Sequence, residues 1–108
     1  MVEMSKYPLT IKQFRTWLKS KNENEIVGIT RTIDRCPMVN FFKSKACISQ
    51  DRVVEVDYFT TEIEDGECYK NPLWVKRFIS ETDDLSENEL TVKKALSILN
   101  WVEVQECT

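Results

Sequence analysis

The spacing of apolar residues changes in the middle of the chain from a helical period to an alternating one, and then changes back. Apolar side chains recur every three or four residues over 11–18, 74–79 and 92–102, which predicts amphipathic helices with one buried face. Over 53–63 they alternate with polar side chains, as in a strand that buries one face. Helices on both sides of a strand segment predict a mainly helical α+β domain.

Local signals mark the start of the first two helices. Thr10 and Gln13 fit a capping box, in which each side chain satisfies a backbone N–H group of the other residue. Pro37 suits the first position of a second helix, with Cys36 as the N-cap residue and an end near Lys45. The sequence therefore predicts two helices in the first half of the chain.

Two further helices are predicted after the strand segment. Asn71 and Pro72 read as an N-cap residue followed by proline at the first helical position. The fourth helix has two candidate starts. One is a capping box formed by Ser86 and Glu89, and the other is a later start at Thr91.

A small antiparallel sheet is predicted between the second and third helices. The alternating segment 53–63 is its best strand, and Asp65 and Gly66 form a hairpin turn signal that leads back through the next residues. Residues 46–50 are a further strand candidate, which makes the sheet two- or three-stranded. Residues 25–29 are compatible with either a short strand or a turn.

The length of 108 residues suits a single compact domain. Its ends, 1–8 and 103–108, are expected to fray. No apolar run reaches the ~20 residues that cross a membrane, and the first residues lack the apolar core of a signal peptide, so we expect a cytoplasmic protein without a membrane partner.

Four cysteines without a paired spacing then predict free, mostly buried thiols.

The residue types that are absent argue against an enzyme. The chain has no histidine and only two glycines, so it lacks the commonest general base and cannot form a glycine-rich phosphate loop. The scattered cysteines do not form a zinc motif. We therefore expect no catalytic residue, no metal and no cofactor, with carboxylate chemistry or a thiol reaction at Cys36 as the enzymatic alternative.

Positive and negative side chains are divided unequally along the chain, and each half therefore attracts surfaces of the opposite sign. Residues 1–46 carry nine Lys/Arg against four Asp/Glu, whereas residues 47–108 carry six against fourteen. The densest acidic region surrounds the predicted hairpin, and aromatic residues there are favoured interface anchors. The predicted protein-binding residues are Glu55, Asp57, Tyr58, Phe59, Glu62, Glu64 and Asp65. The structural alternative is an edge strand that charge protects from aggregation.

The basic first half supports an alternative nucleic-acid-binding site. Its candidate residues, on the first helix and the loop before the second, are Lys12, Arg15, Lys19, Arg31 and Arg35. The alternative is a solvated helix face, and the overall charge of −3 is unlike that of most nucleic-acid-binding domains. If the thiol of Cys36 were exposed, the helix start would lower its pKa.

Four strings resemble a set of short, uncharacterised proteins from cyanobacteria and their phages: Trp17-Leu18-Lys19-Ser20-Lys21, Glu25-Ile26-Val27-Gly28, Cys36-Pro37 and Trp74-Val75-x-Arg77-Phe78-Ile79. The resemblance spans most of the chain. It implies a bacterial or viral setting and carries no site residue.

Charge, size and the absence of catalytic groups predict a small regulator or inhibitor that binds a basic surface of a larger protein through its acidic hairpin. One version is a phage antagonist of nucleic-acid-handling machinery, such as an anti-CRISPR protein. The alternatives are a nucleic-acid-binding transcriptional regulator, and a homodimer in which the basic end of one copy meets the acidic end of another.

Overall fold

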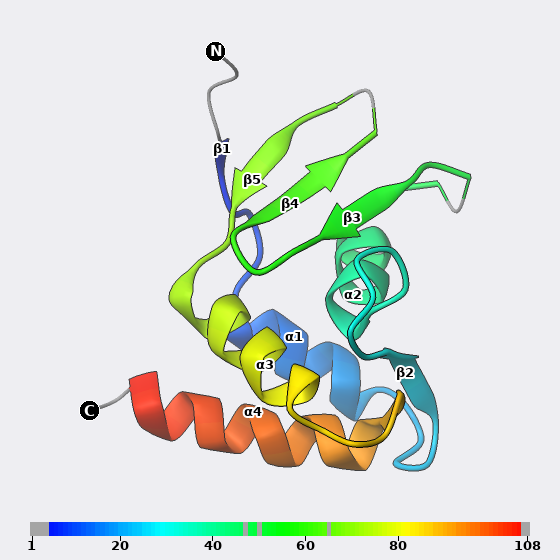
Figure 1. Ribbon diagram of the computed structural model, residues 1–108, viewed down its shortest axis with the longest axis vertical. Helices are drawn as coiled ribbons and strands as arrows, with labels where there is room; N and C mark the ends of the chain where they lie inside the picture. Colours follow the sequence, from blue (N-terminus) through cyan, green and yellow to red (C-terminus); the bar gives the residue numbers. More distant parts are fainter. Residues whose placement is uncertain (1–4, 47, 50, 65, 107–108) are drawn as a thin grey trace.

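The computed structural model describes residues 5–46, 48–49, 51–64 and 66–106. Over these residues the chain forms the expected α+β fold, with four helices and two small sheets (Figure 1). The elements are β1 (Ser5–Lys6), α1 (Ile11–Lys19), β2 (Ile26–Ile29), α2 (Pro37–Lys45), β3 (Val54–Val56), β4 (Thr60–Ile63), β5 (Cys68–Lys70), α3 (Leu73–Asp83), β6 (Glu89–Thr91) and α4 (Val92–Glu106).

The larger sheet has the strand order β1-β5-β4-β3. The β3, β4 and β5 strands are antiparallel, and β1 pairs in parallel with β5 at the edge. The alternating segment 53–63 is two strands rather than the single strand that its period suggested. The carboxylate of Asp57 accepts the backbone N–H groups of Phe59 and Thr60, at 2.8 and 2.7 Å. These bonds form a turn that reverses the chain.

The smaller sheet pairs β2 with β6 in an antiparallel arrangement. Residues 26–29 are therefore a strand, which settles the open interpretation of that segment. The capping box of Ser86 and Glu89 does not start α4, because Glu89 belongs to β6. The helix starts at Val92, and the Thr91 hydroxyl accepts the Lys94 N–H at 3.3 Å. The later of the two expected starts is confirmed.

Two other expectations about elements are wrong. The α3 helix begins at Leu73, with Pro72 as N-cap residue and no side-chain capping bond. Asn71 does not cap the helix because its side chain is buried against the hairpin. The described residues of 46–50 contain no strand, and the Ile48 N–H donates to the Lys43 carbonyl beside the end of α2.

The described parts of the two ends are ordered elements rather than frayed tails. Ser5 and Lys6 pair with β5, and Tyr7 belongs to the core. At the other end α4 continues through Glu106, and the Glu103 carboxylate lies 2.6 Å from the Arg15 guanidinium. Residues 1–4 and 107–108 lie outside the described part of the chain.

Aromatic rings fill the centre of the core. Phe14 of α1 lies 4.9 Å from both Phe41 of α2 and Phe78 of α3, measured between ring centroids. Figure 1 shows the larger sheet at one end of the molecule and α4 at the other, with α1 and α3 between them. The inner face of the sheet packs on α2 through Val54 and Tyr69, and the side chains of its outer face are largely exposed.

Candidate protein-binding site

Two aromatic side chains lie exposed together at the turn between β3 and β4. Tyr58 is 42% exposed and Phe59 is 65% exposed. Their ring centroids are 4.9 Å apart with the planes at 83°, an edge-to-face contact. The ammonium of Lys76 from α3 lies 5.8 and 5.6 Å from the two ring centroids, within cation–π range. An exposed aromatic pair with a fixed geometry is typical of an interface anchor.

Buried hydrogen bonds hold this turn in place. Asn71, only 2% exposed, donates from Nδ2 to the Asp57 carbonyl at 2.8 Å and accepts from the Thr61 hydroxyl at 2.7 Å. Its own backbone N–H donates to the Phe59 carbonyl at 2.9 Å. Together with the hydrogen bonds of the Asp57 carboxylate, these bonds fix both ends of the turn between β3 and β4, which we call the tip. A preorganised loop loses little conformational entropy when it binds a partner.

Replacing Asn71 with alanine should destabilise the protein by about 2 kcal/mol, because buried partners lose their hydrogen bonds. The amides of Phe59 and Thr60 should exchange hydrogen faster, since the tip loses its anchor. Urea unfolding and amide exchange measure the two effects, with the exposed Asn100→Ala variant of α4 as control. Equal stability of the two variants would contradict the anchoring role.

Two other carboxylates face each other across β3 and β4. Glu55 and Glu62 are directly opposed in the register, and both side chains are exposed. Neither makes an ion pair with another residue that the structure describes. Directly opposed like charges are unfavourable in an antiparallel sheet. The free protein therefore keeps an uncompensated negative patch on the outer face of the sheet.

A thiol borders the same patch. Cys68 pairs with Glu62 in the β4–β5 register, and its Sγ lies 4.0 Å from the Glu62 Oε1. Desolvation and the carboxylates of Glu62 and Asp57 raise the pKa of this thiol. Cys68 therefore stays neutral and adds no charge to the patch.

The other predicted acidic residues have different roles. Asp57 is committed to the turn, as described above. Glu64 accepts the Val53 N–H on Oε2 at 3.3 Å, while its backbone N–H donates to the Val53 carbonyl at 2.9 Å. Asp65 lies outside the described residues. Of the six predicted residues that the structure describes, four have no such role within the turn or the strand pair: Glu55, Tyr58, Phe59 and Glu62. We call these four residues the hairpin surface.

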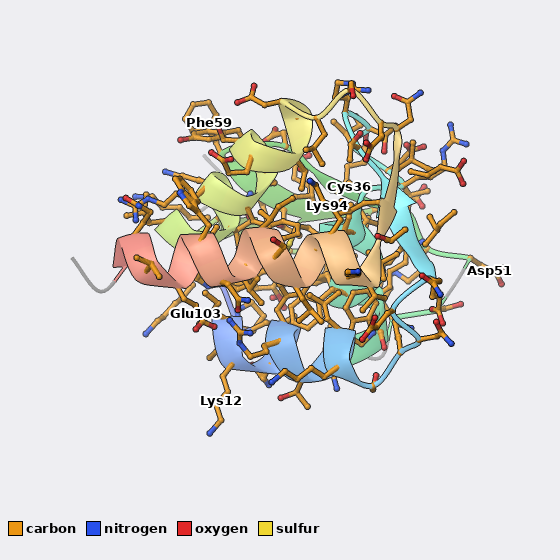
Figure 2. All side chains as sticks on the ribbon, turned by 90° about the horizontal axis from the view of Figure 1, so that it is seen from below. Lys12, Cys36, Asp51, Phe59, Lys94 and Glu103 are labelled. Atoms are coloured by element: carbon orange, nitrogen blue, oxygen red, sulfur yellow. The ribbon has the colours of Figure 1, made fainter. Side chains whose placement is uncertain are left out.

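The basic face of α1 is partly neutralised. Arg15 donates from Nε to the Glu103 carboxylate of α4 at 2.9 Å, and the same pair forms a salt bridge. Lys12 and Lys19 are exposed. Figure 2 shows Lys12 extending from the opposite side of the molecule to Phe59. Lys12 and the hairpin tip therefore lie on different sides of the molecule.

Arg31 has a structural role that the sequence did not indicate. Its backbone has a positive φ of 61°, a region that few non-glycine residues adopt. The guanidinium donates to the Leu85 carbonyl and to the Asn88 side chain, and so joins the loop before α2 to the segment after α3. Arg35 is exposed and lies 3.9 Å from Asp34. Arg31 is therefore engaged within the fold, and the two arginines do not form a shared anion site.

Cys36 is not an activated thiol. It is 8% exposed at the start of α2, and burial raises its pKa to about 11. The expected lowering required an exposed sulfur, which the structure does not provide. Cys36 and Cys68 are both free, while Cys47 and Cys107 lie outside the described residues.

Among the residues that the structure describes, no three potential metal ligands of the His, Cys, Asp or Glu type lie together. None of the described helices combines the length and apolar character that crossing a bilayer requires.

Comparisons with protein-family models, with curated proteins and with solved structures find no match for this chain.

Proposed function

We propose that this protein is a non-enzymatic regulator or inhibitor that binds a basic surface of a larger protein through the hairpin surface. The observation that carries the proposal is the exposed pair Tyr58 and Phe59, held rigid beside the unpaired carboxylates of Glu55 and Glu62. Aromatic side chains supply interface binding energy. Uncompensated charge steers association with a surface of opposite sign and suppresses wrong partners.

The class of partner follows from the charge. A protein surface that binds nucleic acid is rich in Lys and Arg. The Glu55–Glu62 patch would bind such a surface where the phosphates of the nucleic acid otherwise bind. In the bacterial or phage setting that the resemblance implies, such a protein would act in the cytoplasm as an antagonist of nucleic-acid-handling machinery. This version of the proposal rests on charge complementarity and analogy.

Two pairs of variants separate the contributions of the hairpin surface. Tyr58→Ala/Phe59→Ala removes the anchors, and Glu55→Gln/Glu62→Gln removes the charge. The first pair should weaken binding by about a hundredfold and the second by about tenfold. The second pair should also raise the free energy of unfolding by about 0.5 kcal/mol, because it removes like charges that oppose each other. Weaker binding together with greater stability cannot result from unfolding.

The measurement starts with capture of proteins from a cyanobacterial lysate on the immobilised protein, with and without nuclease treatment. The captured partner is then purified and titrated against each variant. Matched controls are Glu87→Gln/Glu89→Gln for the charge and Trp101→Ala/Val104→Ala for exposed apolar side chains. A partner that binds the hairpin variants as tightly as the unchanged protein would refute the proposal. Loss of capture after nuclease treatment would instead favour nucleic-acid binding.

A further inference from the structure

The outer face of α4 carries apolar side chains that remain exposed in the fold. Trp101 is 44% exposed and Val104 is 60% exposed. The two residues are three apart, so their side chains are neighbours on the helix surface. Figure 2 looks directly onto α4, with α1 and α3 on its two sides and no described helix or strand in front of it. Apolar side chains that are exposed together are candidates for an interaction surface.

The charges of α4 oppose the dipole of the helix. The first turn contains Lys93 and Lys94 and no acidic residue, whereas the last turn contains Glu103 and Glu106 and no basic residue. Acidic residues stabilise the first turn of a helix and basic residues the last, because the N-terminal end of the dipole is positive. The α1 and α2 helices follow this rule at their C-terminal ends, where their last turns contain basic residues. In α4 each charged residue is at the less favourable end.

The rest of the described chain leaves the two lysines uncompensated. Both side chains are exposed, and no ion pair joins either of them to an acidic residue that the structure describes. The Glu23 carbonyl accepts the Lys93 N–H at 3.0 Å, but this bond joins backbone groups. Glu103 is paired with Arg15, and 39% of its side chain stays exposed. Both ends of α4 can therefore attract a charge of opposite sign.

We propose that the outer face of α4 binds the same face of a second copy of this chain, in an antiparallel dimer with two-fold symmetry. A two-fold interface uses the same patch of both copies, so the patch must be complementary to itself. The antiparallel orientation provides this complementarity, because it places the basic first turn of each helix beside the acidic last turn of the other. The same orientation opposes the two helix dipoles favourably.

The residue spacing on α4 fits such a pair. Positions 94, 97, 101 and 104 follow one another at intervals of three, four and three residues, the spacing that forms a seam between two helices. In an antiparallel pair centred on this seam, Ser97 faces Trp101 of the second copy, and the small serine leaves room for the indole. Lys94 faces Val104 of the second copy, so its aliphatic stem covers the valine while its ammonium stays near the acidic last turn.

The size of the interface sets the strength of the dimer. A helix of 15 residues is about 22 Å long, and a contact limited to one helix from each copy buries less than the roughly 1,200 Å² of a stable interface. We therefore expect a weak dimer, with a Kd of about 10 to 100 µM. The larger sheet lies at the opposite end of the molecule (Figure 1), so the dimer would carry two free hairpin surfaces. Dimerisation does not depend on whether these surfaces bind a partner.

Sedimentation velocity over a protein concentration of about 5 to 500 µM measures the self-association. A reductant keeps disulfide-linked species out of the measurement. The weight-average sedimentation coefficient should rise with concentration, and the Kd should increase severalfold in about 0.5 M NaCl because salt screens exposed charges. Trp101→Ala/Val104→Ala should weaken the dimer by about tenfold or more and leave the hairpin surface intact. A protein that stays monomeric throughout this range would overturn the proposal.

Lys94→Glu tests the contribution of charge. The change should weaken the dimer by about tenfold, since it places like charges at both ends of the seam. It should not lower the melting temperature of the dilute protein, because an acidic residue in the first turn suits the helix dipole. Lys12→Glu is the matched control: Lys12 is in the first turn of α1, and Figure 2 shows it pointing away from α4. This control should dimerise as well as the unchanged protein.

A second change at position 104 tests the orientation of the pair. Lys94→Glu/Val104→Lys exchanges the charge between two positions that face each other in the antiparallel dimer but not in a parallel one. The double variant should therefore dimerise about fivefold more tightly than Lys94→Glu alone. Equal self-association of Lys94→Glu and Lys12→Glu, or a double variant no tighter than Lys94→Glu, would overturn the proposal.

Discussion

Replacing Gly28 with alanine lowers the free energy of unfolding by about 3 kcal/mol and the melting temperature by about 12 to 15 °C, because it overpacks a rigid contact. A Cβ atom at this position would lie 2.4 Å from the Pro37 nitrogen and 2.7 Å from the Cys36 carbonyl carbon. These are backbone atoms at the start of α2, so no side-chain rotation can relieve the clash. Thermal unfolding followed by circular dichroism measures the change.

Gly66→Ala is the matched control for this prediction. Its Cβ atom would meet the Arg52 guanidinium at 3.0 Å and the Ile63 Cγ2 at 3.4 Å. The closest neighbour is the end of a flexible side chain that can move away. The melting temperature should change by no more than about 2 °C. If the two glycine variants melted together, close packing of β2 against α2 could not be the reason for glycine at position 28.

The second large effect is expected at the centre of the aromatic core. Phe14 is fully buried, and its ring contacts those of Phe41, Trp74 and Phe78. Truncation to alanine leaves a cavity between α1, α2 and α3 and should cost about 4 kcal/mol of stability. The midpoint of urea unfolding should fall accordingly, with an unchanged m-value if folding remains two-state.

The same chemical change at Phe59 provides the control for Phe14→Ala. Phe59 is largely exposed, so Phe59→Ala should cost less than about 1 kcal/mol. The two variants thereby separate the structural aromatic residues from the one assigned to recognition. A comparable loss of stability from both would mean that Phe59 supports the fold, and its assignment to the hairpin surface would fail.

Helix positions could be predicted from the sequence because their signals are local. The capping box of Thr10 and Gln13 is present as expected, since it involves residues three apart. The start of α4 was ambiguous because the Ser86 and Glu89 pattern is equally local. Pairing of β2 with β6 decided it by placing Glu89 in a strand, and such long-range pairing has no local signature.

The strands were harder to predict for the same reason. The alternation over 53–63 hid a turn, although Asp57 is of a residue type that favours turns through its side-chain bonds to the next backbone N–H groups. The two residues of β1 are too few to show any period. Their place depends on a parallel partner far along the chain.

The candidate site could be located from sequence, but its members could not be separated. Charge density pointed to the hairpin, yet it did not distinguish Glu55, which is free, from Asp57, which is committed to the turn. Lys76 was missed because its position over the tip rings results from the docking of α3. Arg15 was expected to face phosphates, but the position of its neutralising partner depends on how α4 packs.

The pairing of Ser5 with Tyr69 has a consequence for the order in which the protein folds. The β3–β4 hairpin joins neighbours in sequence, so it can form early at little entropic cost. The β1–β5 edge must bring together segments that most of the chain separates, and its two-residue strand offers few bonds in return. A nascent or refolding chain is therefore expected to complete the β3–β4 hairpin before β1 joins the edge of the larger sheet.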